Sequence, residues 1–247
     1  MPIAFHDCSF GYRRKIRVLD HLTLAFGRGA TVLLGPNGAG KSTLMGLAAS
    51  ALRPGSGSVA LDGLDTTGRK SVKEYRRRVG WLPQQVRPVT GLRVREQVAH
   101  AGWLKGMSRR EAWEASREAL RAVDLTDLAE RGSAELSGGQ LRRVGIAQAL
   151  VHDAEVLLMD EPTAGLDPVQ RRIFRELVGS LAERTSLVVS THQTEDLADI
   201  YDHVIVLDHG SPRHQGSIVS FLTLAPSETG PERRAEAAYA GLVKAEV

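Results

Sequence analysis

Residues 31–43 constrain the fold of this chain more than any other stretch. Residues 31–34 form a short, mostly apolar run, as expected of a strand buried on both faces. We expect a helix from Ser42 to Leu52, ended near Pro54 and Gly55. From Gly35 on, eight residues match G-x-x-x-x-G-K-[ST], and Thr43 follows them: Gly35, Pro36, Asn37, Gly38, Ala39, Gly40, Lys41 and Ser42. A strand, a glycine-rich loop and a helix in this order predict an α/β fold with a phosphate-binding P-loop.

The composition of this loop suits the triphosphate of a nucleotide. Glycines at 35, 38 and 40 let successive backbone N–H groups turn inward, and the following helix adds its positive N-terminal end. Lys41 should reach the β- and γ-phosphates, and the Ser42 hydroxyl should ligate Mg²⁺. The alternative is an ordinary glycine-rich turn before a helix, which the preceding strand makes the weaker interpretation.

An acidic pair follows a second buried run. Residues 156–159 are apolar and lead directly into Asp160 and Glu161. A carboxylate at the end of a buried strand is costly unless it serves a cation, so Asp160 is the expected Mg²⁺ partner. Glu161 should face the attacking water as general base. The alternative, two acids at the start of a surface loop, is poor in a chain with a P-loop.

Residues 136–140 are Leu136, Ser137, Gly138, Gly139 and Gln140. Ser137 and Gln140 form a capping box, and apolar residues then recur at helical spacing. Two glycines in a first helical turn are poor helix formers, unless a ligand must approach the backbone closely. Because the P-loop already cradles the chain's own nucleotide, this helix start predicts a phosphate held by another copy.

Together these motifs resemble the ATP-binding subunit of ATP-binding cassette (ABC) transporters, from about residue 3 to about residue 210. Further positions match the family's pattern: Tyr12 as the aromatic upstream of the P-loop, Gln84 as the glutamine of the glutamine loop, Asp167 as the last residue of the aspartate loop (164–167), and His192 as the switch histidine.

The resemblance implies an ATPase that uses ATP and Mg²⁺. Glu161, His192 and Gln84 are then catalytic, with His192 on the γ-phosphate, although a lone histidine at a strand end is often structural. The metal site would consist of Ser42, Gln84 and Asp160. Tyr12 would stack on adenine, Asp167 would lie at the nucleotide, and two ATP molecules would lie between head-to-tail subunits. Each ATP would contact one P-loop and the opposing Ser137, Gly138, Gly139 and Gln140.

The implied fold is a P-loop NTPase core with a mainly parallel sheet, an N-terminal antiparallel β subdomain and an inserted α-helical subdomain at about 90–150. Residues 21–26 and 58–62 alternate as half-buried strands, and Ser108 opens a helix to about Val123. Strands near 156–159, 186–190 and 204–207 imply a parallel sheet. The ATPase domain should span 1–215 and a helical extension 216–247, with helices at 217–224 and from Pro231.

Composition restricts the location and the partners. The 247 residues carry a net charge of +3, and no run approaches the ~18 apolar residues of a membrane span. The N-terminus does not read as a secretory signal, and the single Cys8 suits a reducing cytosol and a buried strand position. Arginine clusters could touch phosphates or anionic lipid, yet solvated helix faces explain them at least as well: 76–78, 142–143 and 171–172. No nucleic acid is expected.

We therefore expect a subunit that powers a separate transmembrane permease from the cytoplasmic, inner face of the membrane. Its dimer partner would be a second copy or a paralogous ATPase. Residues 89–96 and 236–239 look similar to exporters of the ABC-2 kind, so export is the first reading and import the second. A soluble ABC-type ATPase acting on DNA or ribosomes is a weaker alternative, because tandem cassettes, long coiled coils and zinc motifs are missing. The pentapeptide and His192 argue against an unrelated P-loop kinase.

Overall fold

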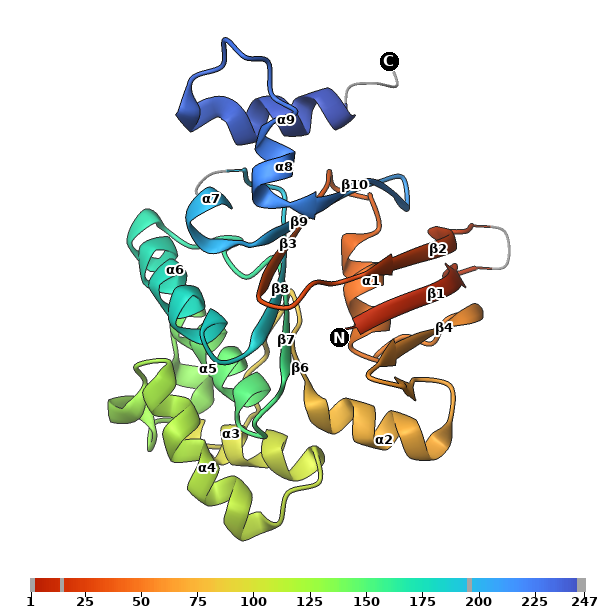
Figure 1. Ribbon diagram of the computed structural model, residues 1–247. Coiled ribbons are helices and arrows are strands. Elements are labelled where there is room, and N and C mark those ends of the chain that lie inside the picture. The colour runs from red at the N-terminus through yellow and green to blue at the C-terminus, as the bar shows by residue number, and fades with distance from the viewer. Residues whose placement is uncertain (1–2, 14–15, 195–196, 244–247) are drawn as a thin grey trace.

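Two β-sheets and their covering helices make up this computed structural model, which describes residues 3–13, 16–194 and 197–243 (Figure 1). One sheet has the strand order β10-β9-β3-β8-β7-β6 and the other β2-β1-β4-β5. The strands are β1 (Ile3–Phe10), β2 (Leu19–Ala25), β3 (Ala30–Leu34), β4 (Ser56–Leu61), β5 (Leu64–Asp65), β6 (Val79–Leu82), β7 (Val156–Asp160), β8 (Ser186–Thr191), β9 (His203–Asp208) and β10 (Ser211–Ser217). The helices are α1 (Lys41–Ala48), α2 (Arg69–Arg78), α3 (Val94–Leu104), α4 (Arg109–Ala122), α5 (Gly138–Leu150), α6 (Pro168–Ala182), α7 (Leu197–Ile200), α8 (Ile218–Leu222) and α9 (Arg234–Val243).

The larger sheet is parallel from β9 to β6, and only β10 joins it antiparallel. All five residues of β3 and all five of β7 are buried, because helices or the second sheet cover both faces. The predicted, mainly parallel core is therefore confirmed.

Side chains of the parallel strands alternate between two apolar layers. Leu33, Leu158 and Val188 face a core shared with α1 and the four-stranded sheet. Their chain neighbours Leu157 and Val189 face a second core shared with α5 and α6. In Figure 1 these layers lie on opposite sides of the sheet, with α8 and α9 at its upper end.

The smaller sheet is antiparallel throughout, as predicted for the N-terminal β subdomain. Cys8 is buried on β1, and its thiol lies 3.0 Å from the backbone oxygen of Ser58 on β4. Burial raises the pKa of this thiol. Its burial on a strand confirms the prediction made for Cys8.

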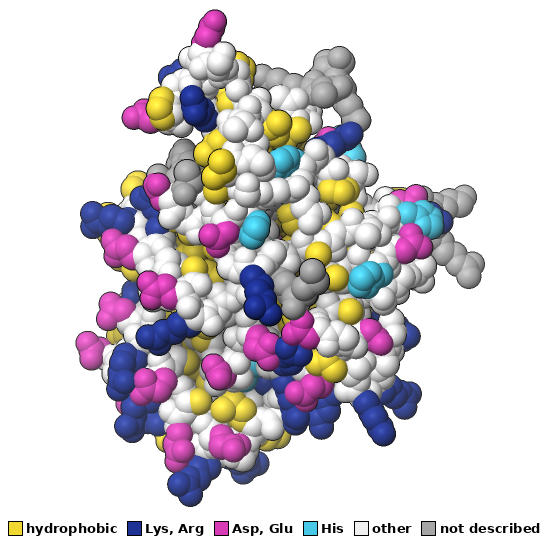
Figure 2. Space-filling model, viewed as in Figure 1, with side chains coloured by type: hydrophobic (Ala, Val, Ile, Leu, Met, Phe, Trp, Pro, Cys, Tyr) yellow, Lys and Arg dark blue, Asp and Glu magenta, His cyan; other side chains and the backbone are white. Residues whose placement is uncertain are grey.

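The inserted subdomain consists of α3, α4 and the first part of α5. Helix α4 begins after Ser108, whose side chain accepts a hydrogen bond from the Glu111 amide at 3.2 Å, so the predicted capping box is present. Basic and acidic side chains are interspersed over this part of the surface (Figure 2). Several are exposed ion pairs that contribute little to stability: Arg110–Glu114, Arg121–Glu118 and Arg131–Glu135.

Helix ends differ from the sequence-based expectations in two places. Helix α1 ends at Ala48 instead of Leu52, because Ser50 has a left-handed backbone (φ 54°) and the amides of Ala51 and Leu52 both donate to the Gly46 carbonyl. The last helix starts with a 3₁₀ turn at Pro231–Arg233 before α9. Residues 244–247 of the predicted extension lie outside the described residues, and the division at residue 215 stays a prediction. No helix among the described residues is long and apolar enough to cross a bilayer.

His152, just after α5, gives the fold a testable acid sensitivity. Burial lowers its pKa from 6.5 to about 4, with a further contribution from the nearby Lys105 charge. Between these two values the unfolded chain binds a proton that the folded chain does not, so stability is lost as the pH falls. We expect the free energy of unfolding in urea to fall less steeply from pH 6.5 to 4 in His152→Gln. The exposed His6→Gln on β1 is the control, and equal slopes in the two variants would contradict the assignment.

Candidate active site

A pocket of about 500 Å³ lies where several parallel strands end. Leu34, Met159 and Thr191 are close to the ends of their strands and lie at the same edge, because β3 pairs with β8 and β8 with β7 in parallel register. The pocket is lined by Tyr12, Val18, Pro36, Asn37, Gly38, Gly40, Lys41, Ser42, Thr43, Gln84, Glu161, Ala164 and His192. The structure thus brings together residues that the sequence places up to 180 positions apart.

The glycines of the P-loop meet different steric demands. Gly38 and Gly40 have φ angles of 86° and 100°, which L side chains rarely adopt. A Cβ at Gly38 would meet no atom within 4 Å, so the backbone there is open to an approaching group. A Cβ at Gly35 would lie 2.2 Å from the Leu207 backbone oxygen, so this position needs glycine for packing against β9.

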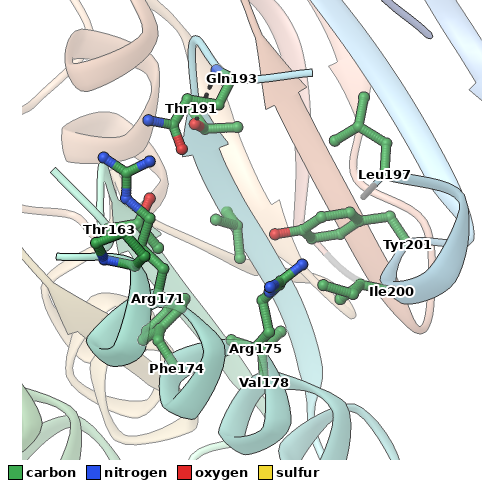
Figure 3. A pocket seen from close by; sticks show the side chains of 12 residues that line it. Thr163, Arg171, Phe174, Arg175, Val178, Thr191, Gln193, Leu197, Ile200 and Tyr201 are labelled. Carbon is green, nitrogen blue, oxygen red and sulfur yellow. Dashed lines mark hydrogen bonds between the residues drawn. The ribbon is translucent and has the colours of Figure 1, made fainter. Parts of the chain in front are cut away.

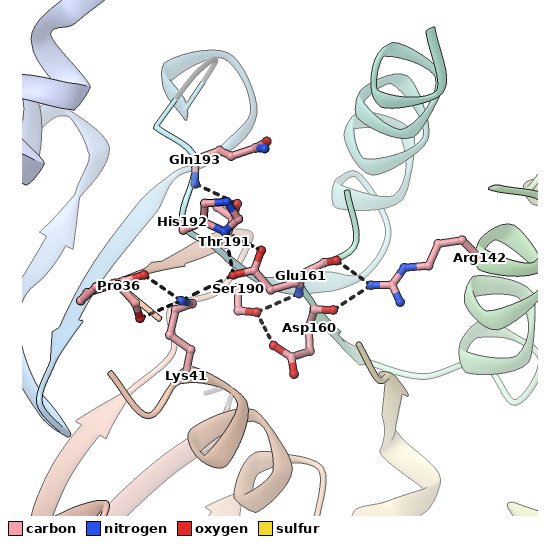
Figure 4. Close-up of polar contacts among 10 residues, drawn as sticks. Pro36, Lys41, Arg142, Asp160, Glu161, Ser190, Thr191, His192 and Gln193 are labelled. Atoms are coloured by element: carbon pink, nitrogen blue, oxygen red, sulfur yellow. Dashed lines mark hydrogen bonds and ion pairs between the residues drawn. The ribbon is translucent and has the colours of Figure 1, made fainter. Parts of the chain in front are cut away.

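Lys41 holds its ammonium group at the inner side of the loop. The Nζ atom donates to the backbone oxygens of Gly35 at 2.7 Å and Pro36 at 3.2 Å. It also lies 3.5 Å from Glu161 Oε1, and both side chains are less than a tenth exposed (Figure 4). A buried ammonium needs such partners, and the arrangement places one positive charge where phosphate oxygens would enter.

Glu161 has a strained backbone that the surroundings hold in place. Its φ is 45°, and such a conformation costs roughly 1–3 kcal/mol for a residue with a side chain. The Glu161 amide donates to Ser190 Oγ at 2.9 Å. Its carboxylate oxygens lie 3.1 and 3.2 Å from His192 Nδ1. Glu161 therefore joins the ends of β7 and β8 at the pocket.

Asp160 lies behind Glu161 and does not line the pocket. It is 3% exposed, and its Oδ1 accepts a hydrogen bond from Ser190 Oγ at 2.6 Å. Sequence reasoning used Ser190 only to locate His192, although a serine at the end of an apolar strand was a usable signal. The structure gives Ser190 a double contact, with the carboxylate of Asp160 and the amide of Glu161.

Tyr12 lies at the edge of the pocket and not in the core. Its side chain is 64% exposed, its ring packs edge-on against Phe10, and its hydroxyl lies 3.2 Å from Thr43 Oγ1. The side chain therefore offers a free aromatic face next to the P-loop.

The other predicted nucleotide contacts lie outside this pocket. Ser137 caps α5, accepting from the Gln140 amide at 3.3 Å and receiving the Gln140 side chain in return. None of the four residues from Ser137 to Gln140 lines the 500 Å³ pocket. Asp167 caps α6 through the Gln170 amide at 2.9 Å and is also absent from the lining.

The reading of residues 142–143 as a solvated helix face is wrong for Arg142. This side chain is 8% exposed and donates to backbone oxygens around the pocket. Nothing in the local pattern of two adjacent arginines distinguishes a buried one from an exposed one, so sequence reasoning missed it.

A separate cavity of about 310 Å³ lies between α6, β8 and α7 (Figure 3). Phe174, Val178 and Val189 line it, and the Tyr201 ring extends into it from the end of α7. Burial raises the pKa of the Tyr201 hydroxyl. The P-loop residues line the 500 Å³ pocket and do not contribute to this cavity.

Fold and pocket together define a P-loop NTPase whose pocket is lined by a lysine, a glutamate and a histidine. The protein-family model described as ABC transporter matches residues 19–164. The chain belongs to this family, and it is an ATP-hydrolysing subunit of an ABC transporter.

Relatives and a solved structure agree with this assignment. The chain is similar to the cobalt import ATP-binding protein CbiO of Rhodobacter capsulatus, 39% identical over 90% of this chain and 80% of the relative. It is also similar to the methionine import ATP-binding protein MetN of Lacticaseibacillus paracasei, 37% identical over 85% of this chain and 60% of the relative. The dimeric structure of MJ0796, a bacterial ABC transporter cassette, aligns with a TM-score of 0.77 and 26% identity, covering 87% of this chain and 98% of that one.

Proposed function

We propose that this subunit hydrolyses ATP between two head-to-tail copies to drive solute uptake through a separate membrane permease. The observation that carries the proposal is the division of the phosphate-binding elements. The P-loop, Glu161 and His192 share one pocket, whereas the glycine-rich start of α5 faces outside it. A helix start with open space around Gly138 is suited to a phosphate held by another chain.

In the proposed mechanism, residues of one chain bind and orient the triphosphate. Lys41 transfers its ion pairing from Glu161 to the β- and γ-phosphates, which leaves the Glu161 carboxylate free to accept a proton from the attacking water. His192 lies within 3.2 Å of this carboxylate and contacts the γ-phosphate from the end of β8. Tyr12 stacks on the adenine, a contact that any base would satisfy.

The residues near the phosphates fit a magnesium ion. Ser42 and Gln84 line the pocket and would offer side-chain oxygens to it, and the buried Asp160 carboxylate would act on it through water. Such oxygen ligands are the ones that Mg²⁺ prefers. When bound, Mg²⁺ would neutralise phosphate charge, while Ser190 orients the Asp160 carboxylate from behind.

Uptake is the direction that the relatives favour. The two named relatives are import proteins, for cobalt and for methionine, whereas the local likeness of residues 89–96 and 236–239 suggested export. We therefore propose import in place of the export reading, with the subunit on the cytoplasmic face of the membrane.

An apolar groove on the helical subdomain is the proposed contact for the permease. It has a volume of about 320 Å³ and lies between α3 and α4, lined by Leu92, Glu96, Ala99, His100, Trp103, Arg109, Ala112 and Trp113. Trp103 is 48% exposed, and the Arg95 guanidinium stacks 3.9 Å above the Trp113 ring. Two half-exposed tryptophans around a groove suit a short amphipathic helix of the partner.

Replacing the proposed base tests the hydrolytic step. Glu161→Gln cannot accept a proton, so we expect turnover to fall at least ~100-fold while ATP still binds and drives dimerisation. Steady-state hydrolysis, nucleotide binding and light scattering measure these three properties. Glu155→Gln is the matched control, because Glu155 lies just before the opposite end of β7 in an exposed ion pair with Arg78. Near wild-type hydrolysis by Glu161→Gln would overturn the assignment.

Mixing two inactive chains tests the composite site. Lys41→Ala removes the P-loop charge, and Gly138→Asp places a carboxylate against the partner's phosphate without a clash inside its own chain. A mixed head-to-tail dimer has one site with both lesions and one with neither, so mixing should restore part of the activity. Gly179→Asp, also in open space but on α6, should stay active alone. Mixed dimers without recovery would indicate a site built within one chain.

Cross-linking in membranes tests the groove. In a Cys8→Ser background, Leu104→Cys (66% exposed, next to the groove) should link to an integral membrane protein, with a yield that changes on adding ATP. Val219→Cys on α8 is equally exposed at 69% and lies at the other end of the molecule (Figure 1). Equal linking from both positions, or linking only to soluble proteins, would contradict the permease contact.

A further inference from the structure

Arg142 is a buried side chain that connects three segments of the active site. It is the fifth residue of α5, and its guanidinium donates five hydrogen bonds of 2.5–3.1 Å, all to backbone oxygens. Two go to the segment after β6, and three go to the last residue of β7 and the two residues after it. The acceptors are Pro83, Gln84, Asp160, Glu161 and Pro162.

The planar guanidinium suits this position because it presents five N–H groups in a fixed fork. Burial lowers the pKa of Arg142, and the nearby charges of Asp160 and Glu161 oppose this effect. A lysine would place one compact ammonium there, which cannot reach acceptors on both segments at once.

The bonds from Arg142 complete the support of the strained Glu161 backbone. The Glu161 amide is held by Ser190 at the end of β8, and its carbonyl is held by Arg142 Nη2 at 2.8 Å. With a φ of 45°, this peptide needs such support on both sides to keep the carboxylate at the pocket. Arg142 Nη1 holds the Gln84 carbonyl in the same way (Figure 4 shows the bonds to Asp160 and Glu161).

Helix α5 therefore has two contacts of different kinds. Its first turn, from Ser137 to Gln140, is the part that meets another chain's nucleotide in the proposed function. Arg142 follows Gly138 by four residues, about one helical turn or ~6 Å along the axis, and it reaches inward to its own chain. The same helix can thus serve two different nucleotide sites.

We propose that Arg142 is a positioning residue that holds Glu161 and Gln84 in their catalytic orientation within its own chain. It acts in cis, whereas Ser137 and Gly138 on the same helix act in trans. The assignment of trans and cis rests on the proposed head-to-tail dimer.

The first test separates positioning from stability. Arg142→Met should keep nucleotide affinity within ~3-fold and lower kcat at least ~10-fold, since a displaced base loses rate and not binding. Arg142→Lys keeps the charge, and its kcat should fall to a smaller extent. It replaces Arg142→Met in this test if the methionine variant does not fold. The control is Arg143→Met, whose guanidinium instead donates to the backbone oxygens of Val123 and Asp124 at 3.2 Å. Loss of affinity and rate together, in proportion to a lower Tm, would overturn the proposal.

The second test uses the mixed dimer of Lys41→Ala and Gly138→Asp chains. Its intact site uses the P-loop and Glu161 of the Gly138→Asp chain and the pentapeptide of the Lys41→Ala chain. Arg142→Met added to the Gly138→Asp chain should abolish at least ~90% of the recovered activity. The same substitution added to the Lys41→Ala chain should leave most of the recovered activity. Equal losses would indicate a general role in the folding of α5 and overturn the proposal. If the unmodified mixture shows no recovery, the head-to-tail proposal fails, and the ratio of kcat loss to affinity loss in the first test still decides the role of Arg142.

Discussion

Parallel pairing of β3, β8 and β7 places the ends of three buried strands at one edge of the sheet, and the P-loop, Glu161 and His192 meet in one pocket because of it. Leu34 lies opposite Thr191, and Asp160 opposite Ser190. The chain leaves each of these strands with a polar or glycine-rich segment, and in open α/β sheets ligands bind in the crevice outside the carboxyl ends of the strands. A P-loop, a carboxylate pair and a histidine thereby converge without any of them being close in sequence.

The same edge contains an unusual density of buried charge. Lys41, Asp160, Glu161 and Arg142 are each less than a tenth exposed. Each has hydrogen-bond or ionic partners, and burial of any one alone would be unfavourable in so low a dielectric. Lys41 opposes Glu161, Ser190 bonds Asp160, and five carbonyls surround Arg142. Two of these charges, Lys41 and Glu161, face the pocket, so the energy of the arrangement responds directly to an entering anion.

Helix α5 connects this charge network to the surface. Its exposed first turn begins with two glycines, and its second turn carries the side chain that binds the loops after β6 and β7. Gly138 and Arg142 are about one helical turn apart, so one helix places both of them. The fold therefore combines an exposed, glycine-containing helix start and an inward-reaching arginine in a single element.

Local motifs were readable from sequence because they depend on residues a few positions apart. The P-loop, the acidic pair and the capping boxes at Ser108 and Ser137 are of this kind, and both capping boxes form as predicted. The end of α1 at Ala48 was not readable, because the left-handed backbone of Ser50 leaves no periodic signal.

By itself, then, the amino-acid order determined the nucleotide-binding class, the buried strands and the motifs that flank them. Only the tertiary structure decided which of these residues meet. Arg142 binds carbonyls 18 to 59 residues away, and Ser190 lies between Asp160 and the amide of Glu161. Such contacts depend on strand order and parallel register, and these properties arise from packing the two apolar layers on the sheet and not from any local pattern.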